Sequence, residues 1–109
     1  MPSGIDQARR DAATFFEAEL PAVAVWIFGP DRARTITCPV LSVLGTDSGP
    51  LFAEGRRFLH EWFTGCVDAD LPGVTHLLQM QAPEAVAEAI GSFLRSVTMR
   101  EDEVRRAHP

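Results

Sequence analysis

Residues 38–47 read CPVLSVLGTD, and this stretch decides the fold. Its apolar run, residues 40–44, is short, nearly continuous and closed by Gly45. A run of this length predicts a strand that is covered on both faces, as strands of parallel sheets are. Pro39 suits the first residue of such a strand, where its missing N–H does least harm. We therefore expect an α/β fold.

The residues that follow predict a helix, a second strand and a closing helix. Residues 51–63 carry an apolar stripe at helical spacing. Residues 66–71 alternate apolar and polar side chains before a Pro-Gly turn, which is a weaker strand pattern. From Pro83 to Val97 apolar residues again recur at helical spacing. The order strand, helix, strand, helix predicts two parallel strands joined by a helical crossover.

Charged side chains within these elements are expected to face solvent. In the first helix they are Glu54, Arg56, Arg57 and Glu61. In the second strand they are Asp68 and Asp70. His60 lies in the helix beside Glu61, so it is also expected at the surface.

The flanking segments are expected to be helical at the N-terminal side and frayed at the C-terminal side. Residues 6–28 have apolar side chains at helical spacing, and Pro21 should kink or break them into two short helices. Residues 31–35 are polar and predict a single turn. Residues 100–109 are charged and predict a frayed, solvated tail.

The predicted sheet has only two strands, which is too few for a stable sheet. The run 40–44 needs a neighbouring strand on each edge, yet the sequence offers one further strand. An isolated pair of strands is marginal in water. We therefore expect an incomplete sheet that needs strands not contained in these 109 residues.

Composition narrows the class of protein. The length suits one domain, and 46% hydrophobic residues are typical of a globular chain. A net charge of −5 argues against a nucleic-acid partner. The longest apolar stretch is too short to span a bilayer, and the N-terminal residues do not have the pattern of a secretory signal. We therefore expect a cytoplasmic protein with no membrane or nucleic-acid partner.

Two cysteines, Cys38 and Cys66, each precede an apolar run. Without an export signal they do not indicate a disulfide framework, so we interpret them as small buried thiols. Further ligands at short spacing are missing from the sequence, so we expect no metal ion and no cofactor.

Three stretches together resemble the C-terminal portion of the α/β-hydrolase family. CPVLSVLGTD resembles its penultimate strand and acid loop, LPGVTH (71–76) the end of its last strand, and PEAVAEAIGSFL (83–94) its closing helix. The resemblance implies a partial α/β-hydrolase fold over residues 36–96. Residues 1–35 would then correspond to the end of a helical cap, and residues 97–109 would form a polar tail.

The resemblance also implies two catalytic residues. His76 takes the position of the family's general base, which accepts the proton of a serine nucleophile and returns it to the leaving group. Asp47 is the candidate for the acid that orients the histidine, although one residue fewer than usual separates it from Gly45. Asp47 could equally be a turn former, since aspartate readily bonds its own backbone. Residues 79–82 either line a pocket or only link the histidine loop to the closing helix.

The sequence does not contain the G-x-S-x-G nucleophile elbow that this family needs. We therefore expect the C-terminal portion of a hydrolase acting on small-molecule esters, lactones or related acyl bonds, inactive by itself. The alternative is a non-catalytic module whose exposed sheet edge pairs with a second copy or a partner chain. A third possibility is a self-sufficient domain, which requires the first 36 residues to cover the sheet.

Overall fold

The structure, a computed structural model, describes residues 3–108. In chain order its elements are α1 (Gly4–Thr14), the wide helical turn η1 (Phe15–Glu19), α2 (Leu20–Val25), α3 (Pro30–Ala33), β1 (Leu41–Gly45), α4 (Pro50–Trp62), β2 (Val67–Leu71), α5 (Leu78–Gln81) and α6 (Pro83–Ala107). The central strand–helix–strand–helix order is the one that the sequence predicts.

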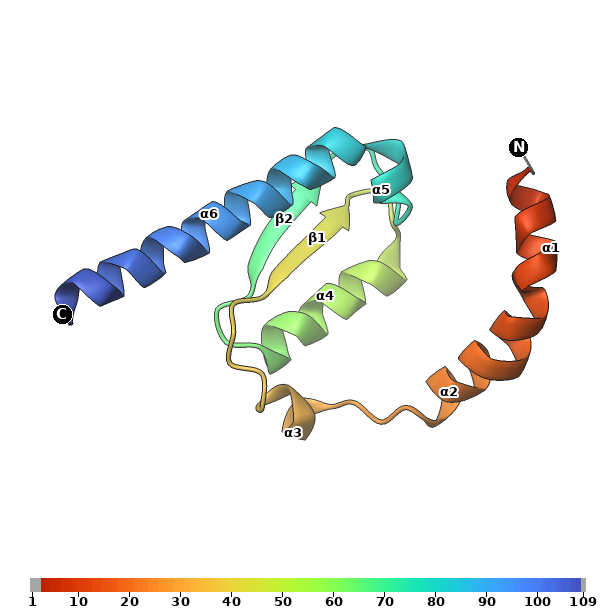
Figure 1. Ribbon diagram of the computed structural model, residues 1–109, viewed down its shortest axis with the longest axis horizontal. Coiled ribbons are helices and arrows are strands. Elements are labelled where there is room, and N and C mark those ends of the chain that lie inside the picture. The colour runs from red at the N-terminus through yellow and green to blue at the C-terminus, as the bar shows by residue number, and fades with distance from the viewer. Residues whose placement is uncertain (1–2, 109) are drawn as a thin grey trace.

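The two strands lie side by side and parallel, in the register Leu41↔Val67 to Gly45↔Leu71. Helix α4 covers one face of this small sheet and α6 the other (Figure 1). The expectation of two parallel strands with flanking helices is therefore confirmed. Within residues 3–108 neither outer edge of the pair carries a further strand, so the sheet is incomplete as expected.

The sheet face beneath α4 is polar. Ser42 of β1 and Asp68 of β2 are register partners, so their side chains lie on the same face. Arg56 of α4 reaches down to this face and is only 13% exposed. The expectation that Arg56 faces solvent is therefore wrong. The polar positions of the strands, Ser42 and Asp68, face α4, so a charged side chain of that helix packs against them.

Few side chains are buried in the described part of the chain. The buried residues are Ala33, Ser42, Gly45 and Leu71. Most of the strand β1 is only half-buried although both of its faces are covered. The open sheet edges explain this, because each strand lacks the neighbour that would exclude water from its flank.

The N-terminal segment forms a bent helix whose bend lies where the proline predicts it. Pro21 is the second residue of α2, directly after the wide turn η1. In that turn the N–H of Leu20 donates to the carbonyl oxygen of Phe15, five residues back. The wider turn makes room for the proline ring, which would collide with the carbonyl four residues earlier in a regular helix. The helix ends at Val25, three residues earlier than expected.

This bent helix, residues 4–25, stands beside the sheet and does not cover it (Figure 1). The radius of gyration is 17.9 Å, whereas a compact chain of this length has about 13 Å. The condition for a self-sufficient domain, that the first 36 residues cover the sheet, is therefore not met. The short helix α3, Pro30–Ala33, confirms the single turn predicted near residues 31–35.

The C-terminal helix is longer than the sequence predicts. Helix α6 continues to Ala107 and projects beyond the sheet (Figure 1). The expected fraying from Arg100 is wrong, although these residues are largely solvated as expected. Glutamate and arginine are good helix formers, and Arg100 bonds Ser96 one turn back at 3.0 Å. The tail's last residue, Pro109, lies outside the described residues.

None of the helices within residues 3–108 combines the length and the apolar character that crossing a bilayer requires.

Candidate functional site

The loops that carry the two predicted catalytic residues are fastened together at the carboxyl ends of β1 and β2. The N–H of Thr46 donates to the carbonyl oxygen of Leu71 at 3.0 Å, and the N–H of Asp47 donates to that of Val74 at 2.9 Å. In return, the N–H of Gly73 donates to Thr46 Oγ1 at 2.9 Å. Open α/β sheets bind their ligands beyond the carboxyl ends of the strands. The loops therefore lie where such a fold places its chemistry.

Gly45 makes this close approach possible. A Cβ atom at this position would lie 2.2 Å from the carbonyl oxygen of Val74 and 2.5 Å from that of Thr75. Both atoms belong to the backbone of the histidine loop, so they cannot move aside without shifting that loop. The glycine that closes the apolar run is required because another loop passes over it.

Gln81 holds the histidine loop from its other side. Its Oε1 accepts from the N–H of Thr75 at 2.9 Å and from the hydroxyl of Thr75 at 3.0 Å. The Thr75 hydroxyl oxygen in turn accepts from the N–H of Leu77 at 3.3 Å. The segment 79–82 thus links and braces the loop, while Met80 is 74% exposed and packs against little. No pattern in the sequence indicates this role of Gln81.

His76 presents its imidazole at the surface. The ring stacks on Phe52 of α4, with centroids 4.7 Å apart and planes 11° apart. Asp47 is also exposed. The two loops are adjacent, yet no hydrogen bond joins the side chains of His76 and Asp47 among the described residues. The structure therefore brings the two predicted residues to the carboxyl ends of the strands, but their side chains do not form the acid–histidine pair.

Ser42, Ser48 and Ser92 do not offer a nucleophile to the imidazole of His76. Ser42 accepts from Arg56 Nε at 3.0 Å and is buried in the α4–sheet layer. The hydroxyl oxygen of Ser48 is buried and has no hydrogen-bond partner in the described structure. Ser92 lies on α6. None of these three serines therefore forms a hydrogen bond with the imidazole of His76.

Arg56 connects α4 to both strands. Besides Ser42 Oγ, it donates from Nη2 to the carbonyl oxygens of Ser42 at 3.1 Å and Ala69 at 3.2 Å. It also pairs with Asp68, with Nε 3.4 Å from Oδ1, and with Asp70. The two aspartates remain partly exposed, as expected, but they also balance a charge that lies inside the layer.

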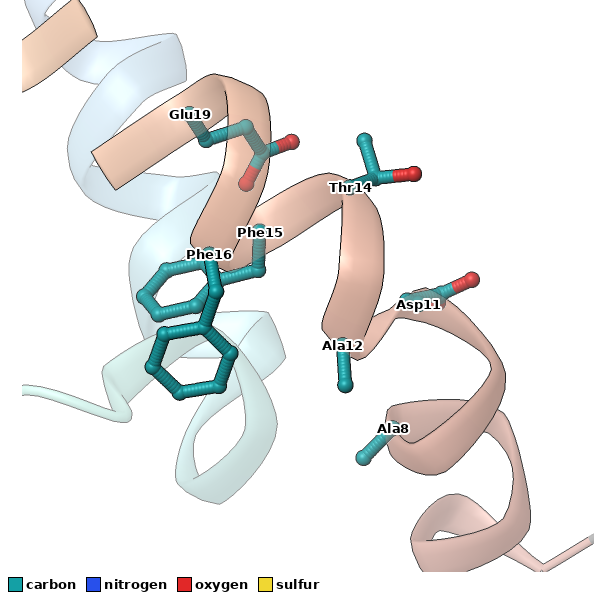
Figure 2. Close-up of a pocket in the computed structure, with 7 residues that line it drawn as sticks. All are labelled: Ala8, Asp11, Ala12, Thr14, Phe15, Phe16 and Glu19. Carbon is teal, nitrogen blue, oxygen red and sulfur yellow. The ribbon is translucent and has the colours of Figure 1, made fainter. Parts of the chain in front are cut away.

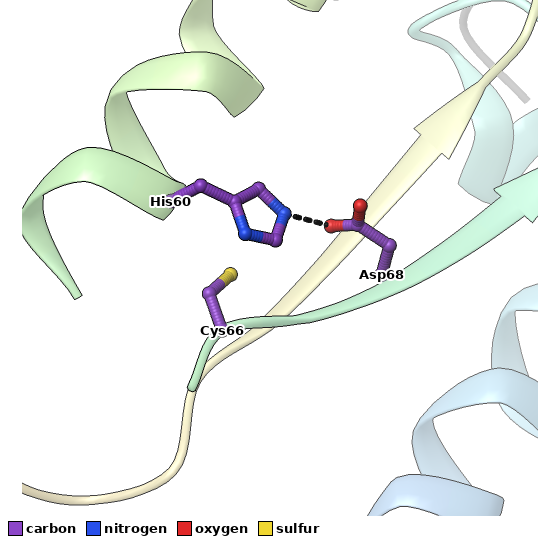
Figure 3. Close-up of side chains that lie close together, drawn as sticks. All are labelled: His60, Cys66 and Asp68. Atoms are coloured by element: carbon purple, nitrogen blue, oxygen red, sulfur yellow. Dashed lines mark hydrogen bonds and ion pairs between the residues drawn. The ribbon is translucent and has the colours of Figure 1, made fainter. Parts of the chain in front are cut away.

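A second cluster lies at the opposite end of the sheet, where α4 ends and β2 begins. His60 Nε2 lies 2.7 Å from Asp68 Oδ1, and Cys66 lies beside both (Figure 3). Partial burial raises the pKa of the Cys66 thiol, with a further contribution from the Asp68 carboxylate that Arg56 opposes. No sequence pattern connects these three residues, because the turn that brings them together is a feature of the fold.

A hollow on the described surface is unrelated to either cluster. It has a volume of about 610 Å³ and lies on the inner side of the bend between α1 and η1 (Figure 2). Its lining residues are Ala8, Asp11, Ala12, Thr14, Phe15, Phe16 and Glu19. One bent helix supplies all of them, so the hollow is an uncovered helix face and not an enclosed cavity.

Comparison of the chain with protein-family models, with curated proteins and with solved structures finds no match. The resemblance to α/β-hydrolases therefore depends on the three stretches quoted from the sequence and on the position of their residues in the fold. It stays a prediction.

Proposed function

We propose that this chain is the C-terminal portion of a cytoplasmic α/β-hydrolase that cleaves esters, lactones or related acyl bonds. In this proposal His76 is the general base and Asp47 orients it. One observation carries the proposal: the hydrogen bond from the N–H of Asp47 to the carbonyl oxygen of Val74 joins the two loops at the carboxyl ends of parallel strands.

The proposed chemistry assigns each side chain one role. The imidazole of His76 accepts the proton of a serine hydroxyl as that oxygen attacks the acyl carbon, and then passes the proton to the leaving group. The Asp47 carboxylate accepts from the other ring nitrogen and stabilises the imidazolium. Both side chains are exposed, so they can turn toward each other when further strands complete the site.

The proposal places the nucleophile on strands that pair with the open edge of this sheet. The described chain has no exposed serine beside His76, and both outer edges of the strand pair are free within residues 3–108. The nucleophile elbow of this family lies on a strand-to-helix turn, at the carboxyl end of a neighbouring strand. We therefore expect these 109 residues to show no turnover alone.

The experiment that tests this proposal compares the bare chain with a completed one. Purified residues 1–109 are incubated with p-nitrophenyl esters, and so is the product of the genomic reading frame extended ahead of Met1. We expect hydrolysis only with the extended protein, whose added sequence should contain G-x-S-x-G. In that protein His76→Gln should lower kcat by about 10²–10⁴-fold, the usual contribution of a general base.

The matched control is His108→Gln, which changes an exposed histidine directly after α6 and should leave kcat unchanged. An extension without a nucleophile elbow, or hydrolysis that survives His76→Gln, would contradict the proposal. Hydrolysis by residues 1–109 alone would contradict the proposal that the nucleophile lies outside these residues.

A second candidate function is a non-catalytic module whose exposed sheet edge pairs with another copy of this chain. It is favoured by the exposed apolar side chains of the bent N-terminal helix, among which Phe16 is 63% and Val23 65% exposed. Exposed apolar surface on this scale is typical of a surface that another chain covers. Light scattering after size-exclusion chromatography separates the candidates: a stable dimer supports the module, and a monomer or an aggregate contradicts it.

A further inference from the structure

One group of ligand-bearing side chains lies apart from the histidine loop. His60, Cys66 and Asp68 each place a donor atom within 4.8 Å of the other two (Figure 3). The side chains of His60 and Asp68 are 43% and 39% exposed, so a dissolved ion can reach them. Three different donor types converge at one point of the surface.

The fold brings these donors together through a tight reversal of the chain. His60 lies in the last turn of α4, and Cys66 directly precedes β2. Between them Gly65 has a φ of +73°, a left-handed conformation that favours glycine. The reversal places the end of the helix over the start of the strand, so six residues of sequence separation become direct proximity.

The donor distances run from 2.7 Å to at most 4.8 Å, a range that includes the spacing around a tetrahedral zinc ion. Zinc bonds to sulfur, nitrogen and oxygen imply donor atoms about 3.3–3.8 Å apart. The distance between His60 Nε2 and Asp68 Oδ1 is 2.7 Å, so this pair would have to separate by somewhat less than 1 Å. Partly exposed side chains at a helix end and a strand start can make such an adjustment by rotation.

The donor chemistry and the local charge also suit zinc. Thiolate, imidazole and carboxylate are the three side-chain ligands that zinc uses in proteins. Asp68 and Asp70 carry two negative charges beside the single positive charge of Arg56. Ionisation of Cys66 adds a third negative charge, so the surrounding groups would balance a divalent cation.

We propose that His60, Cys66 and Asp68 bind a zinc ion, with water as the fourth ligand. The ion replaces the hydrogen bond between His60 and Asp68 and joins the end of α4 to the start of β2. The site lies at the opposite end of the sheet from His76, so it does not depend on the proposed hydrolase function.

Cobalt titration of the purified chain tests this site, since Co²⁺ takes the place of zinc and a bound thiolate gives it a charge-transfer absorption band. After treatment with a chelator, we expect one Co²⁺ per chain, the thiolate band, and its loss when Zn²⁺ is added. Cys66→Ser should remove the band. His60→Gln and Asp68→Asn should each weaken binding about 10-fold or more.

The matched controls are Cys38→Ser and His76→Gln, which change a cysteine and a histidine outside the cluster and should leave binding unchanged. Circular dichroism of every variant checks that it is folded. Cobalt binding without a thiolate band would overturn the proposal, and so would a band that Cys38→Ser removes. Binding that stays as tight in His60→Gln or Asp68→Asn as in the unchanged chain would also overturn it.

Discussion

Arg56 Nε donates a 3.0 Å hydrogen bond to Ser42 Oγ across the layer between α4 and β1. The same guanidinium bonds two backbone carbonyls and pairs with Asp68 and Asp70. A side chain that is only 13% exposed thus connects one helix to both strands. This relationship makes Arg56 the main polar connection in the sheet layer.

We predict that Arg56→Met destabilises the chain by about 2 kcal/mol, because it leaves the Ser42 hydroxyl and the carbonyl oxygens without their donor. Urea unfolding followed by circular dichroism measures the change. The control is Arg57→Met, whose side chain is 58% exposed and pairs only along the helix surface. Exposed pairs of this kind contribute about 0–1 kcal/mol, so equal losses in the two variants would contradict the prediction.

Two glycine-to-alanine substitutions are expected to have opposite effects. Gly45→Ala should destabilise the chain by about 1–3 kcal/mol, because the added methyl group would overlap the backbone of the histidine loop. Gly55→Ala should stabilise it by about 0.5–1 kcal/mol, because Gly55 lies within α4 and open space surrounds its Cβ position. Both free energies of unfolding come from urea titration. A tolerated Gly45→Ala would mean that the two loops are not in close contact.

The ionisation of Cys66 should depend on folding. Partial burial, and after it the Asp68 carboxylate, raise the pKa of this thiol, so the folded chain holds the proton more tightly than the unfolded chain. The associated stabilisation is complete below the unfolded-state pKa and is lost as the pH rises through the folded-state pKa. In Cys38→Ser, where Cys66 is the remaining cysteine, the rate of disulfide exchange with Ellman's reagent should reach half its maximum at a higher pH in buffer than in urea. A chelator excludes metal ions from both measurements, and an equal or lower midpoint in buffer would refute the shift.

Phe28 is predicted to hold the bent N-terminal helix to the rest of the chain. Its ring centroid lies 5.5 Å from that of Trp26, 6.1 Å from that of Trp62 and 6.5 Å from that of Phe63. Phe28→Ala should remove about 1–2 kcal/mol of apolar contact and loosen the backbone around Arg32 and Arg34, which are already exposed, so that trypsin cleaves after them faster. The faster cleavage is read by mass spectrometry, with Phe16→Ala as the control on an exposed ring. Equal cleavage rates in the two variants would argue against this contact.

The sequence by itself determined the two strands and most of the helices of this protein, but neither α5 nor the continuation of α6 beyond Arg100. The run 40–44, the glycine that follows it and the helical spacing after Pro83 define their strand and helix by local periodicity alone. Pro21 likewise marked the bend, because a proline disturbs a helix whatever surrounds it. The incompleteness of the sheet also follows from the sequence, since it depends only on counting the predicted strands. The roles of His76 and Asp47 came from resemblance and stay predictions.

Only the tertiary structure decided which side chains meet. Arg56 looked like a solvated residue because helical spacing does not say that the facing strand carries Ser42 and Asp68. His60, Cys66 and Asp68 belong to a helix, a turn and a strand, and the reversal at Gly65 alone makes them one cluster. Periodicity is a property of each segment, whereas contact depends on how segments are placed relative to one another.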